Sequence, residues 1–273
     1  MHPVLVKIGA LEIRAYGLAL ALSFLIGIYI STYRAKKRGI NPNDIMDLSV
    51  ILIISAIIGS RLLYILFHLE EFRGHWLDTF NPFQSNGQIG IAGLTVLGGV
   101  ILCIISSIIY MRIKKLPFYR FADVIVPAVG FGIFLTRIGC FLNGCCFGIP
   151  CEAEHSLCVT FPYNSAAGSQ FPGVPLVPAQ LYSSLYGLII FITLLLAERW
   201  KKFDGFLLAL FFILYGIARF IIDFYRYYED SMVLFAVGEK GISLNQGISA
   251  LFVVVGIALL IKGYSSVQLK SKK

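Results

Sequence analysis

The sequence predicts an all-α integral membrane protein that crosses the bilayer about seven times. Hydrophobic residues make up 58% of its 273 positions and charged residues only 14%, whereas a soluble domain is usually about 45–50% apolar and about 25% charged. The apolar residues are gathered into runs close to the roughly 20 residues that a helix needs to span a bilayer. Because no long polar stretch separates the runs, we expect residues 1–273 to form a single transmembrane domain.

Seven apolar runs are the candidate membrane-spanning helices. They are residues 16–33, 45–67, 91–110, 121–142, 179–196, 205–224 and 244–261. The first run is too long for a secretory signal and lacks its small-residue cleavage pattern, so we interpret it as a retained helix. The fourth run is rich in glycine and contains Pro127, which makes it the least regular of the seven.

The positions of lysine and arginine predict the orientation of these helices. Fifteen basic residues lie after the first run, between the third and fourth, between the fifth and sixth, and after the seventh, whereas five lie on the opposite side. Residues 143–178, the longest connection on that opposite side, contain neither lysine nor arginine. Cytoplasmic loops carry the excess of basic residues, so we expect the N-terminus outside and the C-terminus in the cytoplasm. We attribute the net charge of +8 to this topology rather than to nucleic acid binding.

Three arginines, Arg61, Arg137 and Arg219, lie inside apolar runs. An arginine at the centre of a bilayer costs roughly 2.5–3.5 kcal/mol on insertion scales. Each of the three falls late in a helix that is expected to run outward. One interpretation is that each side chain snorkels separately to the headgroups. Three arginines at matching depth instead favour a shared polar cavity in the outward half of the membrane.

The sixth run carries Tyr215, Arg219 and Asp223, followed by Arg226, at steps of four, four and three residues. Such steps place side chains on one face of a helix. An acid between two arginines could neutralise them and simply pack the bundle. The alternative is an anion site, since planar guanidinium groups suit phosphate. In a cavity open to the membrane, the most available phosphate belongs to a phospholipid headgroup.

The end of the fourth run and the residues after it are rich in glycine, cysteine and polar groups. Glycine at this density permits unusual turns and close approach of a ligand. Asn143 can donate its side-chain amide to a phosphate or ester oxygen. Gly98 and Gly99, in the third run, fit either close helix packing or a ligand role.

The chain resembles the bacterial prolipoprotein diacylglyceryl transferases along almost its whole length. The residues that carry the resemblance, in order, are Ala15-Tyr16-Gly17, Gly59-Ser60-Arg61 with Tyr64, Gly98-Gly99, Arg137-Ile138-Gly139 with Asn143-Gly144 and Gly148, Pro178 with Gln180-Leu181-Tyr182, Tyr215-Gly216 with Arg219 and Arg226, and Gln246. The resemblance implies transfer of the diacylglyceryl group of phosphatidylglycerol to a lipobox cysteine thiol of a preprolipoprotein. It also implies a multi-pass protein of the bacterial cytoplasmic membrane whose site faces the outer leaflet.

The residues and the resemblance together predict two sets of site residues. The catalytic set is Tyr16, Arg137, Asn143, Arg219, Asp223 and Arg226, in which Arg137 and Arg219 correspond to the family's essential phosphate-binding arginines. The substrate-binding set is Arg61, Gly98, Gly99, Gly148, Gln180, Tyr182 and Tyr215. Preorganised arginines would stabilise charge on a leaving phosphate, and their positive field would help a thiol ionise. We expect no cofactor and no bound metal.

The sequence departs from the family at several polar positions. Leu97 stands where the family usually has a histidine, Cys140 where it has an asparagine, and Cys145 where it has an acidic residue. The phosphate-binding half of the site is therefore better preserved than the half that would meet the acceptor. Two other functions stay open: a paralogue that uses a different acceptor, and a non-catalytic phospholipid-binding or translocating protein.

Five of the six cysteines fall within 19 residues at the expected outer face: Cys140, Cys145, Cys146, Cys151 and Cys158. We favour one or two disulfides that staple the outer loop in an oxidising compartment. Adjacent cysteines rarely pair with each other, so Cys145 and Cys146 are expected to find partners among the other three. The alternatives are a soft-metal site and a reactive thiol.

The expected partners are an anionic glycerophospholipid, a lipoprotein precursor or other acceptor, and the bilayer, with no nucleic acid.

Overall fold

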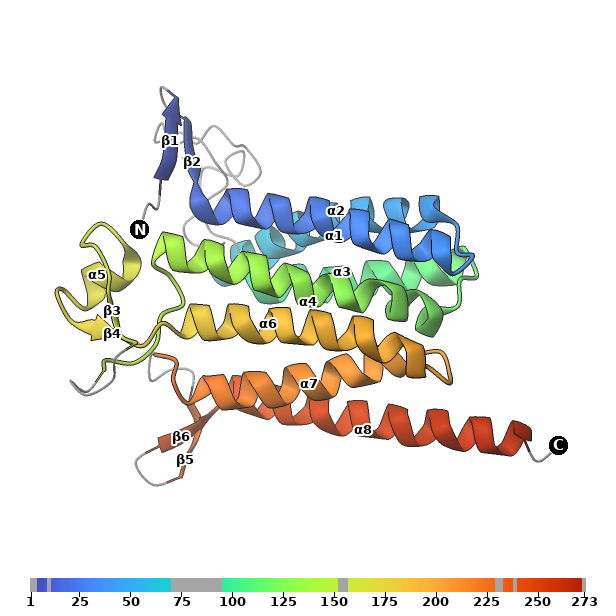
Figure 1. Ribbon diagram of the computed structural model, residues 1–273. Coiled ribbons are helices and arrows are strands. Elements are labelled where there is room, and N and C mark those ends of the chain that lie inside the picture. Colours follow the sequence, from blue (N-terminus) through green and yellow to red (C-terminus); the bar gives the residue numbers. More distant parts are fainter. Residues whose placement is uncertain are drawn as a thin grey trace. The chain divides into compact units, whose positions relative to one another are not determined.

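A computed structural model describes residues 4–8, 11–69, 95–151, 157–228, 233–237 and 240–271 (Figure 1). Each of the seven predicted runs corresponds to a helix: α1 (Ala15–Lys37), α2 (Pro42–Phe67), α3 (Val96–Ile113), α4 (Phe118–Asn143), α6 (Ala179–Ala197), α7 (Phe206–Asp223) and α8 (Leu244–Ser271). The shorter elements are α5 (Ala166–Gln170), the 3-10 helix η3 (Glu198–Trp200), and three strand pairs. These pairs are β1 (Val4–Ile8) with β2 (Leu11–Arg14), β3 (Val159–Thr160) with β4 (Pro175–Leu176), and β5 (Val233–Val237) with β6 (Lys240–Ser243).

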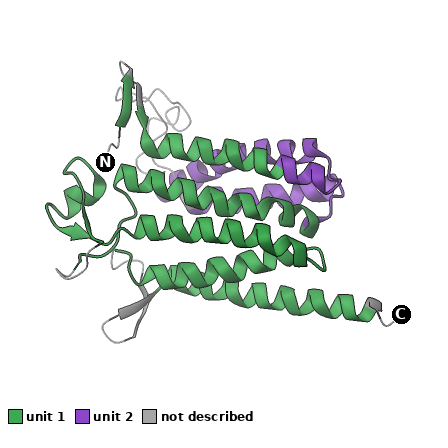
Figure 2. Cartoon of the chain, viewed as in Figure 1, with its two compact units in different colours: residues 1–7, 12–31, 119–273 green, residues 8–11, 32–118 purple. Residues whose placement is uncertain are grey.

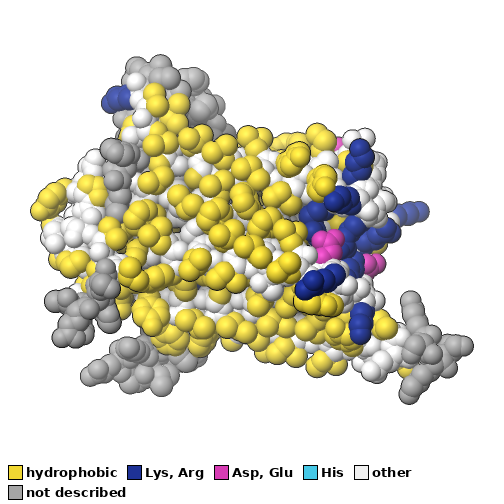
Figure 3. Space-filling view, viewed as in Figure 1, with side chains coloured by type: hydrophobic (Ala, Val, Ile, Leu, Met, Phe, Trp, Pro, Cys, Tyr) yellow, Lys and Arg dark blue, Asp and Glu magenta, His cyan; other side chains and the backbone are white. Residues whose placement is uncertain are grey.

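The helices are long and apolar, as a membrane-spanning bundle requires. Among the described residues, α1, α2, α4, α6 together with η3, α7 and α8 reach spanning length, and α3 is a shorter apolar helix. Residues 91–94, where the third run was predicted to begin, lie outside the described residues. Along their length the helices expose hydrophobic side chains, with lysines and arginines gathered near helix ends (Figure 3). The prediction of an all-α polytopic membrane protein is confirmed.

The chain divides into two compact units (Figure 2). Unit 1 comprises Met1–Lys7, Glu12–Ser31 and Tyr119–Lys273, and unit 2 comprises Ile8–Leu11 and Thr32–Phe118. Unit 1 contains most of α1 together with α4 to α8, and unit 2 contains α2 and α3. The single-domain organisation stays a prediction.

In unit 2, α2 and α3 cross at a contact between two glycines. A methyl group on Gly98 would overlap the carbonyl oxygen of Gly59, and one on Gly59 would overlap that of Gly98. A methyl group on Gly99 would overlap the side chain of Ser60. The Thr95 hydroxyl donates to the Ser60 carbonyl over 3.0 Å. Small residues let membrane helices approach closely, so close packing accounts for the paired glycines of α3.

We expect Gly98→Ala to destabilise the α2–α3 pair by about 1–3 kcal/mol, because the added methyl group forces the two backbones apart. Gly132→Ala is the matched control, since a methyl group on this α4 glycine meets nothing within 4 Å. Thermal unfolding of the purified protein, monitored by circular dichroism, gives the melting temperature of each variant. Equal melting temperatures for the two variants would contradict the close contact.

In unit 1, α1, α4, α6, α7 and α8 lie in that order (Figure 1). Ser23 of α1 and Thr136 of α4 share a hydrogen bond of 3.0 Å, and Ser184 of α6 donates to the Phe134 carbonyl of α4 over 2.8 Å. Gly216 of α7 lies against the Ser249 carbonyl of α8. The start of α1, the end of α4, the start of α6, the end of α7 and the start of α8 share one end of unit 1 (Figure 1), which we call the loop end.

The opposite end of α7 is fixed by a buried carboxylate on α4. Asp123 is fully buried and accepts hydrogen bonds from the backbone N–H groups of Gly205, over 2.8 Å, and Leu208, over 3.0 Å. These are donors that a helix start leaves unsatisfied. Lys201 Nζ lies 2.9 Å from the same carboxylate. An anion here also meets the positive end of the helix dipole, so α7 is held in register with α4.

Candidate functional site

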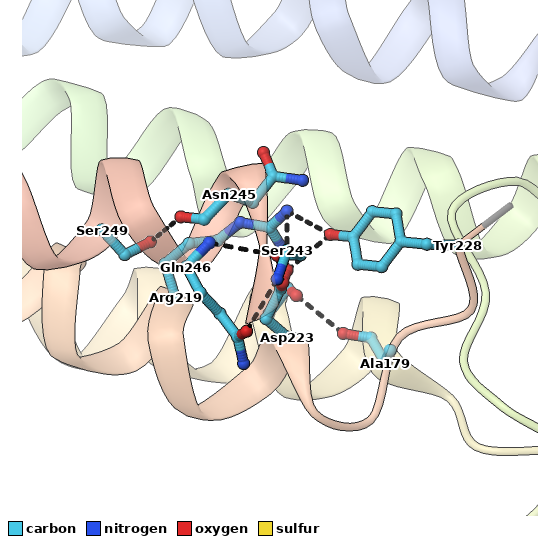
Figure 4. A network of polar contacts seen from close by, with 9 residues as sticks. Ala179, Arg219, Asp223, Tyr228, Ser243, Asn245, Gln246 and Ser249 are labelled. Atoms are coloured by element: carbon cyan, nitrogen blue, oxygen red, sulfur yellow. Dashed lines mark hydrogen bonds and ion pairs between the residues drawn. The ribbon is translucent and has the colours of Figure 1, made fainter. Parts of the chain in front are cut away.

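A buried network at the loop end of unit 1 is centred on Arg219 and Asp223 of α7 (Figure 4). Arg219 Nη2 lies 3.3 Å from Asp223 Oδ1 and donates to the Tyr228 hydroxyl over 2.6 Å. That hydroxyl donates in turn to Asp223 Oδ1 over 2.5 Å. Burial raises the pKa of the Tyr228 hydroxyl, so this group keeps the proton that it donates. Asp223 and Tyr228 together hold the Arg219 guanidinium in place.

The start of α8 is joined to this network through a capping box. Ser243 Oγ accepts from the Gln246 backbone N–H over 3.1 Å, and Gln246 Oε1 accepts from the Ser243 backbone N–H over 3.0 Å. This reciprocal pair satisfies donors at the helix start. The Ser243 hydroxyl also donates to Asp223 Oδ2. Asp223 therefore links the end of α7 to the start of α8.

Arg226 does not continue the α7 face, and the prediction that it shares this face is wrong. The helix ends at Asp223, and Arg226 forms an antiparallel β-bridge with Gly148. The backbone N–H of Ile149 donates to the Tyr225 carbonyl over 3.1 Å. Had α7 continued for another turn beyond Tyr225, the helix would have used that carbonyl for its own hydrogen bonds. After Asp223 the chain makes tighter turns, in which the Arg226 backbone N–H donates to the Asp223 carbonyl over 3.3 Å, and it then pairs with residues 148–149.

Gly148 is required by this pairing. Its backbone N–H donates to the Val177 carbonyl over 3.0 Å, and a methyl group at this position would overlap the carbonyl oxygens of both Val177 and Tyr225. Three chain segments meet at Gly148 and only a glycine fits between them. The role that the structure supports for Gly148 is to place the backbone of Arg226.

Arg137, half-buried on α4, lies close enough to interact electrostatically with Tyr186, Cys146 and Tyr215. Tyr186 of α6 also interacts with Arg219, and Cys146 interacts with Arg226. The Arg226 guanidinium lies over the Tyr228 ring, 5.0 Å from its centroid. Arg137, Arg219 and Arg226 are therefore neighbours, although they come from two helices and the loop after α7.

Four buried polar atoms in this region have no hydrogen-bond partner in the described part of the chain. They are Arg219 Nη1, Arg226 Nε, Tyr186 Oη and Gln180 Oε1. Gln180 is fully buried, and its other side-chain atom, Nε2, donates to the Cys145 carbonyl over 2.9 Å. Buried polar atoms are nearly always hydrogen-bonded. Three of the four, Arg219 Nη1, Arg226 Nε and Tyr186 Oη, can donate a hydrogen bond. Unused donors on and beside two arginines indicate a site for an anion.

The other predicted residues of unit 1 lie around these arginines. Tyr16, at the start of α1, interacts with Arg137 and with the three cysteines Cys140, Cys145 and Cys146. Tyr215 packs edge-on against Tyr186, with the ring centroids 6.2 Å apart. Asn143 hydrogen-bonds to Cys145 through its side chain.

Tyr182 of α6 lines a pocket of about 650 Å³, most of whose other lining residues are apolar: Ile149, Pro150, Cys151, Leu157, Cys158, Val177, Pro178, Ile221, Ile222 and Tyr225. Ile221 and Ile222 precede Asp223 in the chain, so α7 contributes both to this pocket and to the arginine cluster. The loop end thus combines a basic, buried site with an apolar pocket.

The cysteines of the loop end fall into two groups. Cys151 and Cys158 form a disulfide, whereas Cys140, Cys145 and Cys146 are free thiols. The expectation that Cys145 and Cys146 pair with other cysteines is therefore wrong. Hydrogen bonds from the Cys140 and Cys145 thiols and the positive charges of Arg137 and Arg226 hold the pKa of the Cys146 thiol below its usual range, against the effect of burial.

Arg61, Gly98 and Gly99 belong to unit 2 and are described within it. The guanidinium of Arg61 lies 5.7 Å from the centroid of the Tyr64 ring, and its side chain is buried.

Sequence reasoning missed Tyr186, Tyr228 and Ser243. The Ser-x-x-Gln pattern of residues 243–246 is a capping-box signal that marks Ser243, whereas no local pattern distinguishes Tyr186 or Tyr228 from other tyrosines.

Comparison with known proteins gives one consistent result. The family model of prolipoprotein diacylglyceryl transferase matches residues 3–262. Three similar curated proteins are each named phosphatidylglycerol–prolipoprotein diacylglyceryl transferase. The protein of Clostridium tetani is 31% identical over 94% of this chain and 96% of its own length. That of Prochlorococcus marinus is 33% identical over 92% and 87%, and that of Campylobacter hominis is 30% identical over 99% and 94%.

Proposed function

This chain belongs to the prolipoprotein diacylglyceryl transferase family, and from that premise we propose that it transfers the diacylglyceryl group of phosphatidylglycerol to the lipobox cysteine thiol of a prolipoprotein. The observation that carries the proposal is that Arg137, Arg219 and Arg226 are neighbours. Buried donor atoms on and beside them have no hydrogen-bond partner in the described residues. Asp223 pairs with Arg219 there and neutralises one of the three positive charges, so the group of arginines keeps a net positive charge. A phosphate suits it better than a neutral lipid headgroup does.

The arginines would act on the leaving group. The acceptor sulfur attacks a glyceryl carbon, a carbon–sulfur bond forms, and the bond from that carbon to the phosphate oxygen breaks. The electron pair of the broken bond leaves with glycerol phosphate. Donors that are already aimed at the place where this negative charge develops need no reorganisation during the reaction. Arg137 and Arg219 are proposed to bind the phosphate, with Arg219 held in place by Asp223 and Tyr228.

The remaining predicted residues complete the proposed lipid site. Arg226 supplies a third guanidinium, and Gln180 and Tyr186 supply buried polar atoms that a headgroup could engage. Tyr16 and Asn143 lie at the same end, where they interact with the cysteines beside Arg137. The apolar pocket lined by Tyr182 offers a surface for apolar parts of a substrate.

The test is incubation of the purified full chain with phosphatidylglycerol that is radiolabelled in its acyl chains, together with a lipobox peptide. Label in a thioether on the peptide cysteine is the expected result, and the same peptide with serine in place of cysteine should stay unlabelled. Headgroup release without peptide labelling would point to a different acceptor. Lipid binding without headgroup release would point to a non-catalytic lipid-binding protein. Either outcome would overturn the proposed acceptor reaction.

We further propose that the loop end faces the outside of a bacterial cytoplasmic membrane, on the asymmetry of lysine and arginine. Single cysteines placed at two exposed positions, Ser169→Cys in α5 and Lys202→Cys between η3 and α7, are expected to react differently. A membrane-impermeant maleimide applied to intact cells should label residue 169 and spare residue 202, with the sites identified by mass spectrometry. Labelling of both positions in cells, or of residue 202 alone, would refute the orientation.

A further inference from the structure

We propose that Cys140, Cys145 and Cys146 form a binding site for a zinc ion, which takes the acceptor thiol as its fourth ligand. The three sulfur atoms all lie within 4.8 Å of one another. Zinc–thiolate bonds are about 2.3 Å long, so sulfurs that share a tetrahedral zinc lie about 3.8 Å apart. The sulfurs therefore need to approach one another by no more than about 1 Å, a shift that side-chain rotation can supply.

The backbone brings these three thiols to one place. Cys140 is buried in the last turn of α4, and the Cys145 backbone N–H donates to the Cys140 carbonyl over 3.1 Å, which folds the chain back onto the helix end. Gly144 and Cys146 both have positive φ, at 70° and 60°. In an extended chain, adjacent side chains point to opposite sides. The left-handed backbone at Cys146, unusual for a residue with a side chain, lets two adjacent cysteines reach the same point.

The surrounding charges suit a metal–thiolate centre. Metal binding requires deprotonated thiols, and three thiolates around one zinc ion carry a net charge of −1. Arg137 and Arg226 act on Cys146 with positive charge, which compensates that anion in a partly buried place. The three thiols are not consumed by a disulfide, because Cys151 is paired with Cys158.

The role of the ion rests on the proposed function. Three protein ligands leave one tetrahedral position open, which is the pattern of catalytic rather than structural zinc. A thiol that coordinates zinc is deprotonated outright. The acceptor thiol would release its proton to water on binding, and its sulfur lone pair would then attack the glyceryl carbon while glycerol phosphate leaves. Leu97, Cys140 and Cys145 stand where the resembled family has polar or acidic groups, and zinc would supply the thiol activation that these changes remove.

The first arm of the test measures metal alone. The full chain is purified with a phosphine reductant and a chelator, freed of both, and titrated with Zn²⁺ or with Co²⁺ as a spectroscopic substitute. We expect one metal ion per chain, a cobalt–thiolate charge-transfer band, and d–d absorption of tetrahedral type. Cys140→Ser, Cys145→Ser and Cys146→Ser should each weaken binding at least about tenfold. Cys103→Ser, which removes the free thiol of α3, is the matched control and should bind like the parent.

The second arm adds lipobox peptide to the cobalt form. A new sulfur ligand should shift the charge-transfer band, and the serine peptide should not. Three results would overturn the proposal: no metal bound by the parent chain, a disulfide between any two of the three cysteines in the non-reduced protein, or a cobalt spectrum that does not change when the thiol peptide is added. Failure of the proposed function is distinguishable, because a parent chain that binds metal and peptide thiol but labels no peptide would count against the transfer and not against the site.

Discussion

Arg137→Lys is expected to lower the rate of diacylglyceryl transfer by roughly 10²–10³-fold, the range seen when one preorganised donor to a developing anion is removed. Lysine keeps the positive charge but loses the planar pair of donors that matches a phosphate. Arg137 lies beside Tyr186 and Cys146 and belongs to the only group of three neighbouring arginines that we find in the described residues of unit 1.

The measurement is the initial rate of peptide labelling at saturating phosphatidylglycerol, with protein amount and helicity matched between variants. Arg112→Lys is the control, because it makes the same replacement at an exposed arginine in the last turn of α3. We expect the control to retain the parent rate. If Arg137→Ala and Arg219→Ala were both fully active at normal expression, the phosphate site would have to lie elsewhere.

Asp223→Ala is expected to destabilise the protein by about 3–5 kcal/mol, the range for removal of one partner from a buried ion pair. Asp223 is buried and meets Arg219, Tyr228 and Ser243. Its removal leaves the Arg219 charge buried without compensation and releases the start of α8. Asp204→Ala is the matched control: Asp204 pairs with Lys201 over 2.7 Å, but its side chain is 54% exposed, and exposed pairs contribute about 0–1 kcal/mol.

The double variant Arg219→Ala/Asp223→Ala separates the charge effect from the lost packing. Once Arg219 is gone, no uncompensated charge is left, so the double variant should be more stable than Asp223→Ala alone. Thermal unfolding and denaturant titration in the same detergent measure the order of stability of the single and double variants. A double variant less stable than either single variant would show that the carboxylate stabilises the fold by some means other than its pairing with Arg219.

The sequence by itself determined the elements that depend on local composition. Each apolar run became a helix, and the fold class followed from their number and length. Pro127 did not interrupt α4, which runs from Phe118 to Asn143, because neighbouring helices support a membrane helix around a proline. The positions of Arg137 and Arg219 inside apolar runs, together with the order of short motifs, were enough to indicate a member of this family.

Only the tertiary structure decided which groups meet. The place of Arg226 depends on a pairing with Gly148, almost 80 residues away in the chain, and helical periodicity carries no information about such a partner. Tyr228 and Ser243 join Asp223 for the same reason. The choice between thiol and disulfide depends on the distance between cysteines once the chain is folded, so composition could count the cysteines of the loop end but could not pair them. Local patterns report the environment of one segment, whereas a site is made of segments brought together by the fold.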